Sequence, residues 1–107
     1  MATIQEIRNE NHAFLESMKE RRGRFFQMIR TMSRFHRYPV QAQLSIAQHA
    51  PSYASAYATE DIWNRLGRTV PEGATGIDID TGSKEPAVIY EVGNTAGPRQ
   101  NLIYKSS

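Results

Sequence analysis

Apolar residues recur mostly at spacings of three, four or seven positions through the first 38 residues, a period typical of an α-helix. They are Phe14, Leu15, Met18, Phe25, Ile29, Met32 and Phe35. Thr3 followed three residues later by Glu6 is a capping-box pattern, which predicts a helix that begins at Ile4. Gly23 costs about 1 kcal/mol relative to Ala in a helix interior, so we expect a bend, or a junction of two helices, near this residue. Pro39 ends the segment, because the residue before a proline avoids helical geometry.

Two shorter helices are predicted next. The first spans residues 40–49 and ends before Pro51. Residues 52–58 are small residues and tyrosines, a composition that leaves both a short strand and an extended link open. Thr59 precedes two acidic residues, the pattern of an N-cap followed by an acidic first turn. Gly67 is a natural end for the helix that begins there.

The period then changes to two, which indicates β-strands. Residues 76–80 alternate apolar and polar, residues 81–84 have turn composition, and residues 87–92 form a second apolar run. Together they predict an antiparallel hairpin, and residues 101–104 are expected to add an edge strand. Helices first and strands later favour the α+β class.

A length of 107 residues suits one domain. We expect a single domain over 1–107, made of a basic helical arm (1–38) and an α+β module (39–107). The chain has no cysteine, which excludes disulfides, thiol nucleophiles and cysteine-bound zinc. No apolar run is long enough to span a membrane and no signal peptide is visible, so we expect a cytoplasmic protein without membrane contact.

Positive charge is concentrated near the N-terminus. Residues 1–38 carry eight Lys or Arg against four Glu, although the whole chain has a net charge of only +2. Aromatic residues are interspersed with these arginines, a combination that suits single-stranded nucleic acid because bases stack on rings while phosphates pair with guanidinium groups. An acidic protein surface, or a solvated helix whose aromatics are core residues, fits the same pattern. The candidate binding residues are Arg21, Arg22, Arg24, Arg30, Arg34, Arg37 and Tyr38.

Other side chains indicate structure more than chemistry. Trp63 is expected to anchor the core, because large aromatics dominate small cores. Asp78 and Asp80 share one face of a strand; we expect solvated charges there, although a divalent cation is an alternative. The three histidines are scattered and no nucleophile elbow is present. We therefore predict no enzyme activity, no catalytic residue, no metal site and no cofactor.

An ordered set of short motifs spans residues 38–92. The set consists of Tyr38-Pro39, Gln43-Leu44, Ala47-Gln48, Pro51, Ala54-Ser55-Ala56, Ile62-Trp63-Asn64, Gly67-Arg68, Val70, Gly73 to Ile77, and Val88-Ile89-Tyr90. It resembles the N-terminal module of LtrC-like and DNA-methylase/helicase fusion proteins from mobile elements of Gram-positive bacteria, and more distantly the single-stranded-DNA-binding module of ArdC-type antirestriction proteins. Glu72 and Thr75 stand where the family has a basic residue and a lysine, so a nucleic-acid contact by that turn is in question.

The resemblance implies a small phage or mobile-element accessory protein, present here as the module alone. We expect it to counter host defence by stoichiometric binding, as an antirestriction or anti-CRISPR inhibitor of a nuclease complex or of its guide or target nucleic acid. The alternative is a single-stranded nucleic-acid-binding module that serves element transfer or replication. A nuclease with a metal at Asp78 and Asp80 is a third hypothesis. The sequence leaves the oligomeric state open.

Overall fold

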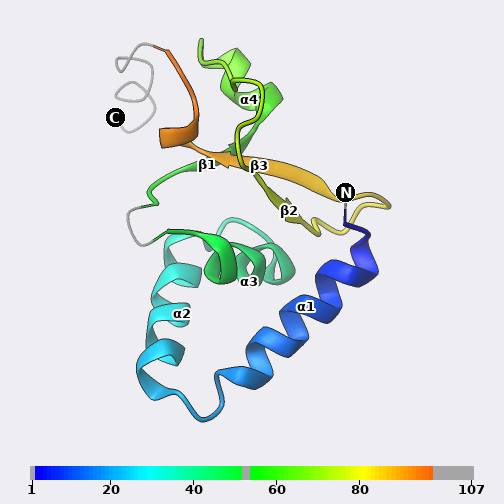
Figure 1. Cartoon of the computed structure of the whole chain (residues 1–107), viewed down its shortest axis with the longest axis vertical. Coiled ribbons are helices and arrows are strands. Elements are labelled where there is room, and N and C mark those ends of the chain that lie inside the picture. The colour runs from blue at the N-terminus through cyan, green and yellow to red at the C-terminus, as the bar shows by residue number, and fades with distance from the viewer. Residues whose placement is uncertain (1, 52–53, 98–107) are drawn as a thin grey trace. The chain divides into compact units, whose positions relative to one another are not determined.

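The computed structural model describes residues 2–51 and 54–97. Three helices come first, and within the described ranges the strands form a three-stranded antiparallel sheet in the order β1-β3-β2. The predicted α+β class is therefore confirmed. The chain divides into two compact units, residues 1–50 with 77–87 and residues 51–76 with 88–107. In chain order the elements are α1 (Ile4–Ser17), α2 (Arg22–Arg34), α3 (Val40–His49), β1 (Tyr57–Thr59), α4 (Glu60–Arg65), β2 (Ile77–Ile79), β3 (Ala87–Glu91) and the 3₁₀ turn η1 (Val92–Asn94) (Figure 1).

Most of the element boundaries predicted from short sequence motifs agree with the structure. The Thr3 hydroxyl accepts a hydrogen bond from the Glu6 amide at 3.1 Å, and the Glu6 carboxylate accepts one from the Thr3 amide at 3.0 Å, so the capping box is confirmed. The helix predicted over residues 40–49 is α3. The expected break near Gly23 comes slightly earlier, over residues 18–21, and Gly23 lies in the first turn of α2. The edge strand expected at 101–104 lies outside the described residues.

In the first unit, α3 packs against both α1 and α2 (Figure 1). One core cluster joins the three helices through Met18, Met28 and Leu44. Met28 is the buried residue of α2. It therefore fixes which side of α2 turns inward and which side is left to solvent.

A buried polar side chain also ties α1 to α3. Asn11 of α1 is 1% exposed, and its amide nitrogen donates to the backbone and side-chain oxygens of Gln41, each at 2.9 Å. The Ser45 hydroxyl donates to the Asn11 side-chain oxygen at 3.1 Å. A buried amide whose hydrogen bonds are all formed favours one specific packing of the two helices. In another packing the same amide would be buried without partners, which costs free energy.

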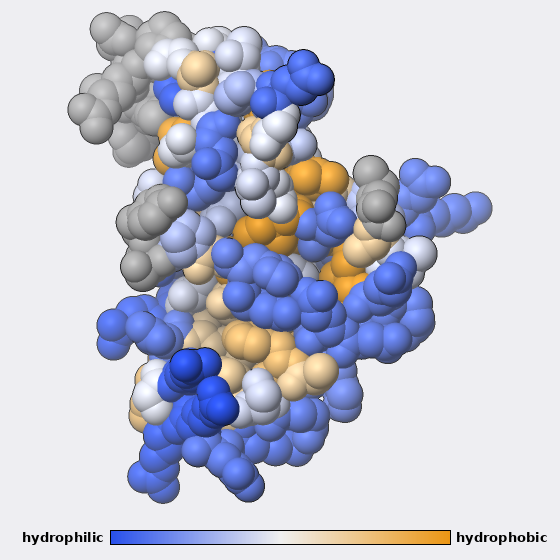
Figure 2. All heavy atoms as spheres, viewed as in Figure 1, coloured by the Kyte–Doolittle hydropathy of each residue, from blue (hydrophilic) through white to orange (hydrophobic). Residues whose placement is uncertain are grey.

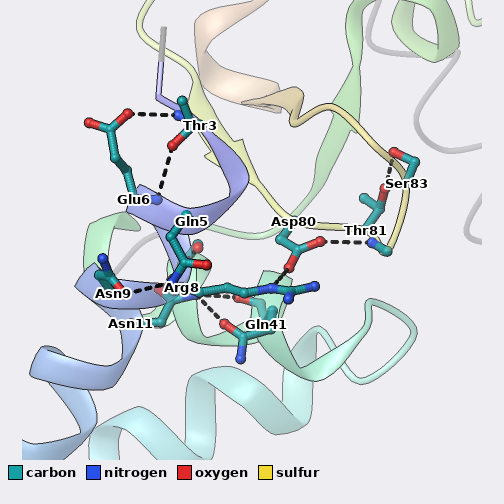
Figure 3. A network of polar contacts seen from close by, with 12 residues as sticks. Thr3, Gln5, Glu6, Arg8, Asn9, Asn11, Gln41, Asp80, Thr81 and Ser83 are labelled. Atoms are coloured by element: carbon teal, nitrogen blue, oxygen red, sulfur yellow. Dashed lines mark hydrogen bonds and ion pairs between the residues drawn. The ribbon is translucent and has the colours of Figure 1, made fainter.

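The expectation that Asp78 and Asp80 are solvated charges is wrong. Asp80 is only 2% exposed; its carboxylate accepts from the Arg8 guanidinium at 2.6 Å and from the Gly82 amide at 2.8 Å (Figure 3). Asp78 is half-buried and accepts from the Ala2 amide at 3.2 Å. Asp78 lies in β2 and Asp80 directly follows it. Through these two carboxylates the N-terminal segment, which includes Ala2 and Arg8, is hydrogen-bonded to the strand against which α1 packs.

The bonds to Asp80 predict a pH dependence of stability. The Arg8 guanidinium, and next the Gly82 amide, hold the pKa of Asp80 below its ordinary value. A carboxyl with a lowered pKa in the folded state stabilises the fold above its unfolded pKa of about 3.9 and loses that contribution as pH falls through the folded pKa. We expect Asp80→Asn to cost about 1 kcal/mol near neutral pH, a modest value because half-exposed Arg8 is screened by solvent.

Urea unfolding of the parent and of Asp80→Asn from neutral pH to pH 3 checks this expectation. The difference in unfolding free energy between the two proteins should shrink as the solution becomes more acidic than pH 4. Asp78→Asn is the matched control, because the Asp78 carboxylate accepts the Ala2 amide and has no arginine partner among residues 2–51 and 54–97. A constant difference across the whole pH range would contradict the assigned role of Asp80.

In the second unit, β1 pairs with β3 in antiparallel register, with Ala58 opposite Tyr90. Trp63 of α4 is 2% exposed, and its indole nitrogen donates to the Tyr90 carbonyl at 2.9 Å. The prediction that Trp63 anchors the core is confirmed. Thr59 caps α4 as expected, since its hydroxyl accepts the Ile62 amide at 3.4 Å.

Glycine is needed in the turn that precedes β2. Gly73 has φ +83°, a conformation that other residues rarely adopt. A Cβ at Gly76 would lie 2.5 Å from a Val88 methyl and 2.9 Å from the Tyr90 ring. Conformation and close packing therefore explain these two glycines without a ligand.

Candidate functional site

The candidate residues 21–38 lie on α2 and on the turn that follows it. Helix α2 begins at an N-cap, Arg21, that makes no side-chain capping bond, and its first turn contains no acidic residue. Arg22 and Arg24 instead add positive charge where the helix dipole is already positive. This arrangement disfavours the isolated helix, and departures from local rules of this kind are expected at functional sites.

Most of these arginines form no ion pair with a carboxylate in the part of the chain that the structure describes. The ion pairs of the described chain are Arg8 with Asp80, Lys19 with Glu16, His49 with Glu10 and Arg65 with Asp61. Arg34 has other contacts. The exposed arginines of the segment that form no ion pair with any described acidic residue are Arg21, Arg22, Arg24, Arg30 and Arg37.

The aromatic residues of the segment divide between core and surface. Phe35 is buried. Tyr38 is half-buried, which raises the pKa of its phenol, and it offers only part of its ring to a partner. Phe25 and Phe26 are 39% and 64% exposed, with ring centroids 6.2 Å apart and planes at 74°.

Helix geometry explains why Phe26 faces solvent. It lies two residues before Met28, which places the two side chains about 200° apart around the helix. Because Met28 enters the core, Phe26 points away from it. The exposed ring lies among the arginines of α2. Figure 2 shows hydrophilic side chains interspersed with apolar ones over the part of the first unit where α1 and α2 lie.

The structure brings only some of the candidate residues together. Residues four apart on a helix are neighbours on one face, so Arg22, Phe26 and Arg30 form a continuous line that we call the α2 stripe. Arg24 lies on a different side of the helix, and Arg37 lies beyond its end. Sequence reasoning included these arginines alike but did not single out Phe26, because the sequence does not show that Met28 is the residue of α2 that enters the core. Phe25 and Ile29, which belong to the predicted apolar face, are 39% and 43% exposed.

Clusters of titratable side chains outside α2 do not form a second candidate site among the described residues. His49 and Glu10 are 2.6 Å apart but exposed. Over residues 2–51 and 54–97, no three His, Cys, Asp or Glu side chains gather where a metal ion could be held. Within the same ranges, no helix has the length and apolar character needed to cross a bilayer.

No protein-family model, curated protein or solved structure matches the chain. The resemblance to LtrC-like and ArdC-type modules therefore stays a prediction from the sequence. The site is defined by the α2 stripe and the uncompensated arginines around it.

Proposed function

We propose that this protein binds single-stranded nucleic acid, without catalysis, through the α2 stripe. The observation that carries the proposal is an exposed phenylalanine, Phe26, between two arginines that have no acidic partner in the described chain. Guanidinium groups pair with phosphates and an exposed ring stacks with a base. One face of one helix thus offers both contacts that a single strand requires.

The exposed ring favours a single strand over the other anionic partners. A duplex hides the faces of its bases, so Phe26 would add nothing to a purely electrostatic duplex contact. An acidic protein surface would use the arginines, but the face of an aromatic ring carries partial negative charge and does not attract carboxylates. Unpaired bases use the arginines and the ring together.

The biological role we propose follows the resemblance. A protein of a phage or mobile element that binds single strands would counter host defence by occupying the guide or target strand of a nuclease complex, in the cytoplasm of a bacterial host. A role in element transfer or replication would use the same surface. The two roles differ in whether a defence complex is inhibited, which a cleavage assay with and without the protein measures.

Fluorescence anisotropy with labelled oligonucleotides tests the binding itself. We expect the protein to bind single-stranded DNA or RNA more tightly than a duplex of equal length. The logarithm of the binding constant should fall linearly with the logarithm of salt concentration between roughly 50 and 200 mM, with a slope of about −0.7 for each phosphate contact. Two stripe arginines alone predict a slope of about −1.4.

Poly-glutamate is the control polyanion, because it has comparable charge and no bases. Equal affinity for poly-glutamate and for single strands would show that the surface recognises charge alone. Absence of binding to every single strand would contradict the proposed function.

A further inference from the structure

We infer that Phe26 is a platform for one unpaired base, with a preference for purines, and that Arg22 and Arg30 contact the phosphates on either side of that base. This inference rests on the proposed function and specifies its ligand. It requires that one ring and not two receives a base, and that the arginines lie where the backbone of that nucleotide passes.

The geometry of the two phenylalanines allows one stacked base. Successive bases that stack in a strand lie nearly parallel, but the planes of Phe25 and Phe26 are 74° apart in an edge-to-face arrangement. A base that lies flat on one ring therefore cannot be continued by a second base on the other. Phe26 is the more exposed of the two, at 64% against 39%, so Phe26 receives the base and Phe25 supports it from the side.

The arginines lie on both sides of this platform. Arg22 precedes Phe26 by four residues and Arg30 follows it by four, which puts each about 6 Å along the helix axis from Phe26 and on the same face. A nucleotide within a strand has one phosphate before it and one after it. A base on Phe26 consequently brings one phosphate toward each arginine, and both guanidinium groups are exposed and without an acidic partner among the described residues.

Stacking sets the expected base preference. Stacking strength gives modest sequence preferences without hydrogen-bond readout, and a two-ring purine covers more of the Phe26 face than a one-ring pyrimidine. We therefore expect adenine to bind more tightly than thymine or uracil, and each of them more tightly than an abasic position.

The test uses short strands whose positions are all abasic except the central one, which carries adenine, thymine or no base. The parent should bind the adenine strand about tenfold more tightly than the fully abasic strand, with thymine between them. Phe26→Ala and Phe26→Leu should bind all three strands equally and keep the salt dependence of the parent. Phe26→Trp should retain the adenine preference, because it keeps an aromatic face.

Two kinds of control variant separate the ring from other contributions. Ile29→Ala removes a neighbouring side chain that is 43% exposed but has no ring, so it should keep the full adenine preference. Arg22→Gln and Arg30→Gln should each make the salt slope shallower by about 0.7 while the ratio of adenine to abasic affinity stays as in the parent. Circular dichroism of each variant checks that its helices are kept.

The outcomes distinguish the inference from the proposed function. If the parent binds no single strand at all, the proposed function fails. If the parent binds ordinary single strands but shows no preference for the adenine strand over the abasic one, or if Phe26→Leu keeps that preference, the proposed function stands and the inference is overturned. If Ile29→Ala loses the preference as fully as Phe26→Ala, the patch acts as a general apolar surface and the inference is again overturned.

Discussion

Replacement of both Arg22 and Arg30 by Glu should weaken binding to a single-stranded oligonucleotide by at least about thirtyfold. If each guanidinium contributes about 1 kcal/mol through its charge-assisted contact, the loss of two costs about 2 kcal/mol, and the new acidic groups add repulsion. The salt dependence should become much shallower, because fewer counterions are released when the variant binds. The melting temperature should change little, because both arginines are exposed and an acid at position 22, in the first turn of α2, complements the helix dipole.

The control reverses the same amount of charge elsewhere, in Arg65→Glu with Lys84→Glu. Because Arg65 forms an ion pair with Asp61 at 2.9 Å, the melting temperature of this control is measured beside its affinity. Both residues are exposed and lie outside α2. This control should lower affinity only slightly, through the change in net charge. Equal losses for the two double variants would show that overall charge, and not the α2 stripe, drives association.

Trp63→Ala should lower the free energy of unfolding by roughly 3 to 5 kcal/mol, the usual cost of removing a buried large aromatic. The side chain is 2% exposed and its indole nitrogen bonds to the Tyr90 carbonyl, so both packing and a buried hydrogen bond are lost. This is a large share of the 5 to 15 kcal/mol that typically stabilises a domain. Urea unfolding followed by far-ultraviolet circular dichroism measures the loss, since the sole tryptophan is removed.

Trp63→Phe separates the two contributions. It keeps a ring in the core but leaves the Tyr90 carbonyl without the indole donor, so about 1 to 3 kcal/mol should be lost. Stability should therefore decrease from the parent to Trp63→Phe and further to Trp63→Ala. An alanine variant as stable as the parent would contradict the assignment of Trp63 to the core.

Local elements of this fold could be predicted from the sequence because their causes lie within a few residues. The Thr3 and Glu6 side chains close a capping box three residues apart. The helix of residues 40–49 follows Pro39, and Thr59 caps the next helix. The alternation over 76–80 and the apolar run over 87–92 indicated strands, which the structure places at Ile77–Ile79 and Ala87–Glu91. Each of these signals acts through backbone geometry within a few residues, so it does not depend on which other elements pack nearby.

Burial of polar side chains could not be predicted in this way. Asp80 has the alternating pattern of a solvated strand residue, yet its partner Arg8 lies 72 residues earlier. Asn11 has the appearance of a surface residue in a polar helix, yet it bonds to Gln41, 30 residues later. Whether such a group is solvated or buried depends on which element covers it, and only tertiary packing decides that.

The candidate site shows the same division. The sequence by itself determined that residues 21–38 combine arginines with aromatics, and hence that an anionic partner was the hypothesis to pursue. It did not determine which aromatics are available, because apolar residues occur on several sides of α2. The packing of Met28 into the core sets the rotation of that helix. With that rotation Phe26 faces solvent beside Arg22 and Arg30, whereas Phe35, just beyond the helix, is buried.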